Sequence, residues 1–224
     1  MRLSRPIVTL LIVISLGFTV PLFAQFNLSS ALLDKVEQKY NSHARKRLEL
    51  WQQLIDDNQT IPEREKLEIV NAFFNTNVLF MDDIDLWKQK DYWATPLEML
   101  SIGGGDCEDY SIAKYFTLKE LGVDEDKLRI TYVKAKELNQ AHMVLTYFET
   151  KRSIPLVLDN LIIEIKPASQ RPDLTPVYSF NGTGLWLAKS RGEGQRVGES
   201  SRLSLWQDLE NRMKLQLKDE ISTE

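Results

Sequence analysis

The chain has a single cysteine, Cys107, and only two histidines, His43 and His142, among its 224 residues. One cysteine excludes an internal disulfide, and so few histidines leave no Cys/His cluster of the zinc-binding type. In an exported protein a lone thiol is a liability, because it is open to oxidation and mispairing. If the chain is exported, we therefore expect Cys107 to be retained for its chemistry.

Several other signatures are missing. The sequence has no Walker loop, no Rossmann glycine pattern, no internal repeat and no low-complexity tract. Its formal net charge of −4 favours solubility and argues against a nucleic-acid-binding surface. The acids Asp82, Asp83 and Asp85 are interpreted as a polar turn rather than as metal ligands, and His43 as part of a solvated helix face.

The first 24 residues have the pattern of a secretory signal. Two arginines form a basic start, residues 7–18 are apolar, and Ala24 closes the segment with a small side chain. We predict export to an oxidising compartment and removal of residues 1–24. Leu22 stands where a smaller residue is usual, so a retained membrane anchor is the alternative. Residues 25–224 are then expected to form one domain.

Cys107 follows three glycines and begins a helical pattern. The run Gly103-Gly104-Gly105-Asp106-Cys107 predicts a tight turn into a helix that ends near Gly122. The first turn of a helix has unpaired N–H groups and the positive end of the helix dipole, which favour a thiolate. A cysteine nucleophile is prepared for acyl transfer in this way. The alternative is a small, buried, unreactive cysteine.

Hydrophobic periodicity divides the rest of the chain into helices and strands. Helical spacing runs from residue 29 to residue 75, and a T-x-x-E capping box starts a short helix at Thr95. After Gly122 the period changes to two. The predicted elements are strands at 129–135, 141–148 and 156–165, a hairpin at 175–188, and an outer C-terminal helix with Leu203, Trp206, Met213 and Leu217 on its apolar face. Helices followed by an antiparallel sheet predict the α+β class.

A thiol nucleophile needs a base, and the base needs an orienting group. His142 lies at the start of one predicted strand, and Asp159 lies at the end of the next apolar run. Neighbouring strands are about 4.8 Å apart, so the two side chains can meet. The order Cys107, His142, Asp159 therefore predicts a catalytic triad of nucleophile, general base and orienting carboxylate.

Four segments closely resemble the bacterial transglutaminase-like cysteine proteinases of the LapG type, over about residues 30–190. They are Asp91-Tyr92-Trp93-Ala94-Thr95-Pro96, Gly105-Asp106-Cys107-Glu108-Asp109-Tyr110, Ala141-His142-Met143-Val144 and Val157-Leu158-Asp159-Asn160. The resemblance implies a papain-like, transglutaminase-like fold and the same three catalytic residues.

The resemblance also implies a biological setting. It is that of a periplasmic, calcium-dependent endopeptidase that clips a large cell-surface adhesin near its N-terminus at a pair of alanines, which releases the adhesin and disperses biofilm. An inner-membrane receptor of the LapD kind, which binds cyclic-di-GMP on its cytoplasmic side, would sequester the protease. We expect the protease itself to be a monomer.

Three carboxylates flank the cysteine, at Asp106, Glu108 and Asp109. They would raise the pKa of the thiol unless a cation offset their charge, and oxygen ligands favour calcium. We predict a Ca²⁺ site there, completed by backbone carbonyls and water; the alternative is that these acids only cap the helix. Tyr92 and Trp93 are expected to wall a narrow substrate cleft, or else to be core aromatics.

Two other functions are compatible with the same residues. A transglutaminase-like amidase or acyltransferase would use the same triad with a different acceptor in the cleft. A non-catalytic, calcium-dependent binding module would hold a vestigial cysteine, although a complete triad argues against it. The reactivity of the thiol toward iodoacetamide separates the last function from the others.

Overall fold

The computed structural model describes residues 27–187 and 194–221. The predicted signal segment lies outside these residues, as do Ala188 at the end of the predicted hairpin and the side chain of Leu217. The helices are α1 (Ser30–Lys39), α2 (Ser42–Asp57), α3 (Glu63–Asn77), α4 (Asp83–Leu86), α5 (Pro96–Ile102), α6 (Cys107–Glu120) and α7 (Ser204–Ile221). None of the helices in this described part is long and apolar enough to cross a membrane.

The strands form one large antiparallel sheet and one small parallel pair. The strands are β1 (Leu79–Phe80), β2 (Gly104–Gly105), β3 (Leu128–Ala135), β4 (Gln140–Tyr147), β5 (Leu156–Leu158), β6 (Lys166–Pro167), β7 (Leu174–Phe180), β8 (Leu185–Leu187) and β9 (Gln195–Gly198). In the large sheet the order is β6-β5-β4-β3-β7-β8-β9. The predicted α+β class and the two central strands are confirmed, and β7 and β8 form the predicted hairpin.

Local sequence explains where the helices begin and end. Ser29 and Asn41 accept backbone N–H bonds at the starts of α1 and α2, as N-cap residues do. The predicted capping box of Thr95 and Glu98 is present at α5. Gly122 has a φ of +80° just after α6, a left-handed conformation that suits glycine and ends the helix.

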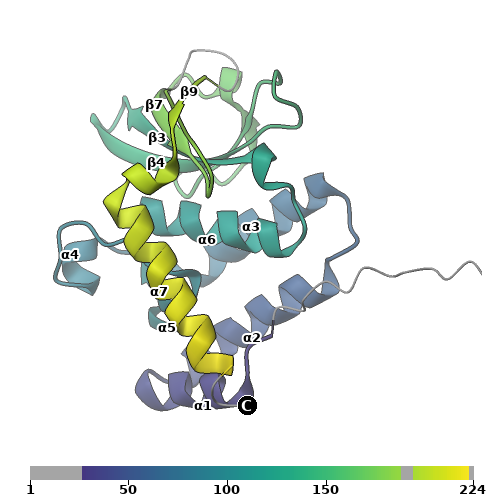
Figure 1. Cartoon of the computed structure of the whole chain (residues 1–224), viewed down its shortest axis with the longest axis vertical. Helices are drawn as coiled ribbons and strands as arrows, with labels where there is room; N and C mark the ends of the chain where they lie inside the picture. The colour runs from purple at the N-terminus through teal and green to yellow at the C-terminus, as the bar shows by residue number, and fades with distance from the viewer. Residues whose placement is uncertain (1–26, 188–193, 222–224) are drawn as a thin grey trace, which may run out of the picture.

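Helix α6 is the centre of the molecule. It runs beneath the sheet and beside α3, while α7 crosses in front of it and α1 and α2 lie at the far end (Figure 1). Ile112, Tyr115 and Leu118 of α6 are fully buried, as is Leu145 of β4. On the opposite face of the sheet a second, smaller apolar cluster forms. Apolar side chains therefore cover both faces of the sheet at β4, the strand that carries His142.

One prediction about the fold was wrong. Residues 161–165 are not a strand, because the carboxylate of Asp159 accepts the N–H of Leu161 at 3.0 Å and turns the backbone out of the sheet. Leu161 and Ile163 are consequently exposed. The predicted amphipathic C-terminal helix is present as α7: Trp206, from its predicted apolar face, is completely buried against Tyr115 and Phe180, while Leu215 is exposed.

Candidate active site

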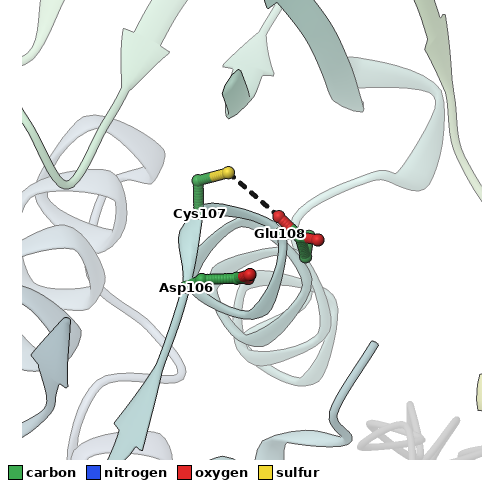
Figure 2. A group of neighbouring side chains, drawn as sticks. All are labelled: Asp106, Cys107 and Glu108. Atoms are coloured by element: carbon green, nitrogen blue, oxygen red, sulfur yellow. Dashed lines mark hydrogen bonds between the residues drawn. The ribbon is translucent and has the colours of Figure 1, made fainter. Parts of the chain in front are cut away.

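The glycine turn places Cys107 at the first position of α6. Gly103 has a φ of +78°, which favours glycine. A Cβ on Gly105 would lie 2.8 Å from the side chain of Asp109, so only glycine allows this close approach. Figure 2 shows the thiol of Cys107 pointing away from the end of the helix, with Glu108 beside it. Local backbone geometry thus presents the sulfur at a helix N-terminus, as predicted.

The surroundings of the sulfur oppose its ionisation. Cys107 Sγ donates to Glu108 Oε2 at 2.9 Å (Figure 2). Burial and this carboxylate raise the pKa of the thiol well above its usual range, while the backbone N–H of Met143 acts in the other direction. Burial and the negative charge beside Cys107 thus both act against the helix dipole, which favours the thiolate.

His142 and Asp159 form a buried pair at the end of the sheet. His142 Nε2 lies 2.8 Å from Asp159 Oδ1, and the residues are 3% and 1% exposed. Burial alone would raise the pKa of Asp159, but hydrogen bonds from His142, Leu161 and Arg171 lower it to about 2. An ionised carboxylate only accepts, so Nε2 carries the proton and Nδ1 is left as the basic nitrogen.

Cys107 and His142 line the same cavity, which has a volume of about 530 Å³. Trp93 lines this cavity too, and its ring stacks on Phe180 at 5.4 Å. Phe80 and Tyr132 are further apolar walls. The three residues predicted as a triad are thus brought together, with the thiol and the imidazole at one open cleft and Asp159 behind the imidazole.

Tyr92 does not belong to this cleft, and the expectation that it walls the site needs correction. Its ring packs against Trp87, with centroids 4.6 Å apart, and beneath the guanidinium of Arg212. Its hydroxyl donates to Glu98 at 3.2 Å. The side chains of Tyr92 and Trp93 point in opposite directions because they are adjacent in an extended segment, so only one of them can face the cavity.

Carboxylates from three segments meet beside the cysteine. Oxygens of Asp83, Asp106 and Asp109 lie within 4.8 Å of one another, and Asp83, Asp91 and Glu108 form a second such group. Burial first, then neighbouring carboxylates, raises the pKa of Asp83 to about 6 and that of Asp106 well above its usual range. The three acids predicted from the sequence are therefore joined by Asp83 and Asp91.

This cluster has the properties of a cation site. Asp83 Oδ1 and Asp106 Oδ1 are buried, and neither has a hydrogen-bond partner among the residues described. Buried carboxylate oxygens without a hydrogen-bond partner are costly, so such a group fits a bound cation. Asp109 differs, because its Oδ1 accepts the N–H of Ala94 at 2.7 Å and its Oδ2 the N–H of Asp106 at 3.4 Å. It holds the loop before the nucleophile whether or not it also binds a metal.

The interpretation of Asp83 as part of a polar turn needs correction, because Asp83 lies in the carboxylate cluster beside Cys107. It is 3% exposed, and its Oδ2 accepts the N–H of Tyr92 at 2.5 Å. The available signal was three acids directly after an apolar run, in a chain with a second acidic group at Cys107. Arg171, Lys114 and Asn75, which bind Asp159, were also missed. His43 is exposed, as expected.

The geometry can be compared with known proteins. Residues 34–177 match the model of a family described as bacterial transglutaminase-like cysteine proteinases. The chain belongs to this family. The fold and the enzyme class of a transglutaminase-like cysteine proteinase therefore apply to it, and the class expected from the sequence is confirmed.

Solved structures agree with the family assignment. The chain is 47% identical to an EGTA-treated LapG of Legionella pneumophila, covering 83% of this chain and 98% of that one, with a TM-score of 0.73. A calcium-bound structure of the same Legionella protein is 48% identical over 83% of this chain and 99% of that one, with a TM-score of 0.70. The comparison with curated proteins gives no match.

Proposed function

We propose that this cysteine proteinase is a periplasmic, calcium-dependent endopeptidase. Its substrate would be a large cell-surface adhesin, cleaved near the N-terminus at a pair of alanines so that the adhesin is released and biofilm disperses. The observation that carries the catalytic part is the buried His142–Asp159 hydrogen bond of 2.8 Å, next to a cleft that also exposes Cys107. The likeness to LapG supports the substrate and its setting.

The reaction proceeds by acyl transfer in two halves. His142 Nδ1 accepts the thiol proton as Cys107 Sγ attacks the scissile carbonyl carbon and forms a tetrahedral oxyanion. The N-terminus of α6, where the first backbone N–H groups have no partner within the helix, would stabilise that developing charge. The imidazolium then gives its proton to the leaving amine, the C–N bond breaks, and an acyl-enzyme remains. Water, deprotonated by His142, then attacks the thioester carbonyl carbon, the C–S bond breaks, the carboxylic acid product leaves, and the imidazolium returns its proton to the sulfur.

The acidic cluster is proposed as the calcium site, with Asp83, Asp106 and Glu108 as ligands and Asp91 and Asp109 beside them. The calcium-bound LapG structure supports this assignment, and the donor set consists of the oxygen ligands that calcium prefers. When bound, calcium would neutralise the carboxylates that raise the pKa of the thiol. Side chains alone fall short of the 6–8 ligands calcium takes, so backbone carbonyls and water are expected to complete the shell.

Restraint by a membrane receptor is part of the same proposal. An inner-membrane, LapD-like receptor that binds cyclic-di-GMP would hold the protease when that nucleotide is abundant. The support for this partner is the family resemblance. The predicted signal at residues 1–24 supports a location on the same side of the membrane as such a receptor's outer domain.

One experiment tests the endopeptidase. The mature protein is incubated with an N-terminal adhesin fragment from the same cell, with calcium or with excess chelator, and the new ends are sequenced. We expect a single cut between two alanines, in calcium only, and none with Cys107→Ala. A fragment whose alanines are replaced by Leu-Leu should resist, because Trp93 narrows the cleft. Equal cleavage of the Leu-Leu site, or full activity in chelator, would contradict the proposal.

A further inference from the structure

Arg171 is a buried arginine in contact with the third catalytic residue. Its side chain is 2% exposed, and it follows a single 3₁₀ turn, η2 (Ala168–Gln170). Its Nη2 donates to Asp159 Oδ2 at 2.7 Å. Its Nε and Nη2 also donate to the carboxylate of Asp173, at distances from 2.7 to 3.2 Å. Among the described residues, the guanidinium is hydrogen-bonded to two aspartates, Asp159 and Asp173.

The carboxylate of Asp159 is divided between two sets of partners. Oδ1 accepts from His142 Nε2 at 2.8 Å and from the N–H of Leu161 at 3.0 Å. Oδ2 accepts from Arg171. With both oxygens bound, the carboxylate plane cannot rotate without breaking a charge-assisted hydrogen bond. The direction of the bond to the imidazole is thus set partly by a residue outside the triad.

The loop that carries Arg171 is anchored on the same face of the sheet as the imidazole. His142 and Val144 are two residues apart on β4, and Val157 of β5 is two residues before Asp159, so each pair lies on one face of the sheet. Those valines pack with Leu174, immediately after the loop. The N–H of Lys136 donates to the carbonyl of Asp173 at 2.8 Å, which fixes the loop to the end of β3. Arg171 therefore reaches Asp159 from a rigid support.

Stability does not explain this arginine well. A buried ion pair loses in desolvation much of what it gains in attraction. Arg171 Nη1 is buried with no hydrogen-bond partner among the described residues, which adds a further cost. An apolar side chain of similar volume, opposite a neutral partner, would fill this place at less cost. A group kept in spite of that cost at a catalytic carboxylate points to a role in the reaction.

We propose that Arg171 is a positioning residue for catalysis: it fixes the Asp159 carboxylate, and through it the ring of His142. Asp173 holds the guanidinium in place from the other side. The inference rests on the proposed triad. Arg171 does not line the cleft, so it acts on turnover and not on substrate binding.

The test is a double-mutant cycle between Arg171→Met and Asp159→Asn, with an alanine-containing adhesin fragment as substrate and calcium in excess. We expect Arg171→Met alone to lower kcat by about tenfold to a hundredfold, as small misplacements of catalytic groups do, with KM unchanged. In the Asp159→Asn background, Arg171→Met should not lower kcat further, because the carboxylate that Arg171 orients is gone. The rate of alkylation of Cys107 by iodoacetamide gives a second readout that needs no substrate.

Two further variants keep the test decisive. Arg171→Lys keeps the positive charge but loses the planar set of N–H donors, so its kcat should lie between those of Arg171→Met and wild type. It also replaces Arg171→Met in the test if that variant fails to fold. Arg196→Met is the matched control, because Arg196 also pairs with an acid but lies on the surface; its kcat should be unchanged. An equal loss from Arg171→Met in both backgrounds would overturn the inference. Wild-type kcat in Asp159→Asn would instead overturn the triad itself.

Discussion

The ammonium group of Lys114 lies 3.2 Å from the backbone carbonyl oxygen of Asp159. Lys114 belongs to α6, the helix that begins with the nucleophile, and its Nζ also donates to the side chain of Asn75 on α3 at 2.9 Å. Asn75 in turn donates to the same carbonyl of Asp159 at 2.8 Å. A buried hydrogen-bond triangle thus links the helix of Cys107 to the residue that orients His142.

This lysine should give the protein a specific pH dependence. Burial lowers the pKa of Lys114 to about 7, against an opposing effect of Asp159. Between pH 7 and about pH 10, the unfolded chain therefore holds a proton that the folded chain lacks, so this group makes stability rise with pH. We expect the difference in free energy of unfolding between wild type and Lys114→Met to grow from pH 7 to pH 9.5, measured by urea denaturation in excess calcium.

The control for this measurement is Lys35→Met, because Lys35 is an exposed lysine on α1. Its difference from wild type should not change over the same pH range. A Lys114→Met difference that is equally constant would show that the ammonium keeps its proton in the folded state.

A second prediction concerns the anchoring of α7. Trp206 is fully buried, and its ring meets Phe116 at 5.6 Å and Phe180 at 5.2 Å. Trp206→Ala should lower the free energy of unfolding by about 3–5 kcal/mol, as large-to-small changes in a core do. Leu215→Ala, on the same helix but 59% exposed, should change it by less than about 0.5 kcal/mol. Equal effects in the two variants would mean that α7 is not part of the core.

Local signals in the sequence predicted much of this fold. The glycines before Cys107, the capping box at Thr95 and the period-two pattern after Gly122 each specify backbone geometry within a few residues, and the structure contains all three. The run after Asp159 was misjudged because its apolar residues looked like a strand. There a side-chain bond to the backbone of Leu161 decided the conformation.

The sequence predicts the site residues whose chemistry only a few residue types can supply. It does not predict those whose role depends on contacts between distant parts of the chain. With one cysteine and two histidines, few triads can be drawn. Asp83 and Arg171 could not be found in the same way, because arginines and aspartates are abundant and their roles depend on contacts far apart in sequence. Asp83 meets Asp106 only because β1 pairs with β2, a parallel pairing of two residues that no periodicity shows.

The catalytic residues should differ in how much activity survives their loss. Cys107→Ala and His142→Ala should each abolish cleavage while the fold stays intact, because acyl transfer needs both groups. The kcat of Asp159→Ala should be about a hundredfold higher than the residual kcat of Cys107→Ala or His142→Ala. The reason is that Asp159 orients the imidazole and does not itself react. The measurement is kcat on the adhesin fragment. Wild-type turnover in Cys107→Ala would rule out Cys107 as the nucleophile.

The last prediction is that Asp83 is needed for calcium although it lies far from the cysteine in the sequence. Asp83 has a buried, unpaired oxygen and lies in one group with Asp106 and Asp109, so Asp83→Ala should remove a ligand and weaken binding. Calcium binds the folded chain, and a titration should therefore raise the melting temperature of wild type by mass action. Asp83→Ala should show little rise in melting temperature and need more calcium for cleavage.

Asp85→Ala is the matched control, on the same short helix but exposed, and it should respond to calcium as wild type does. If Asp83→Ala kept the full calcium response, the ion would have to be held by the acids around Cys107 alone.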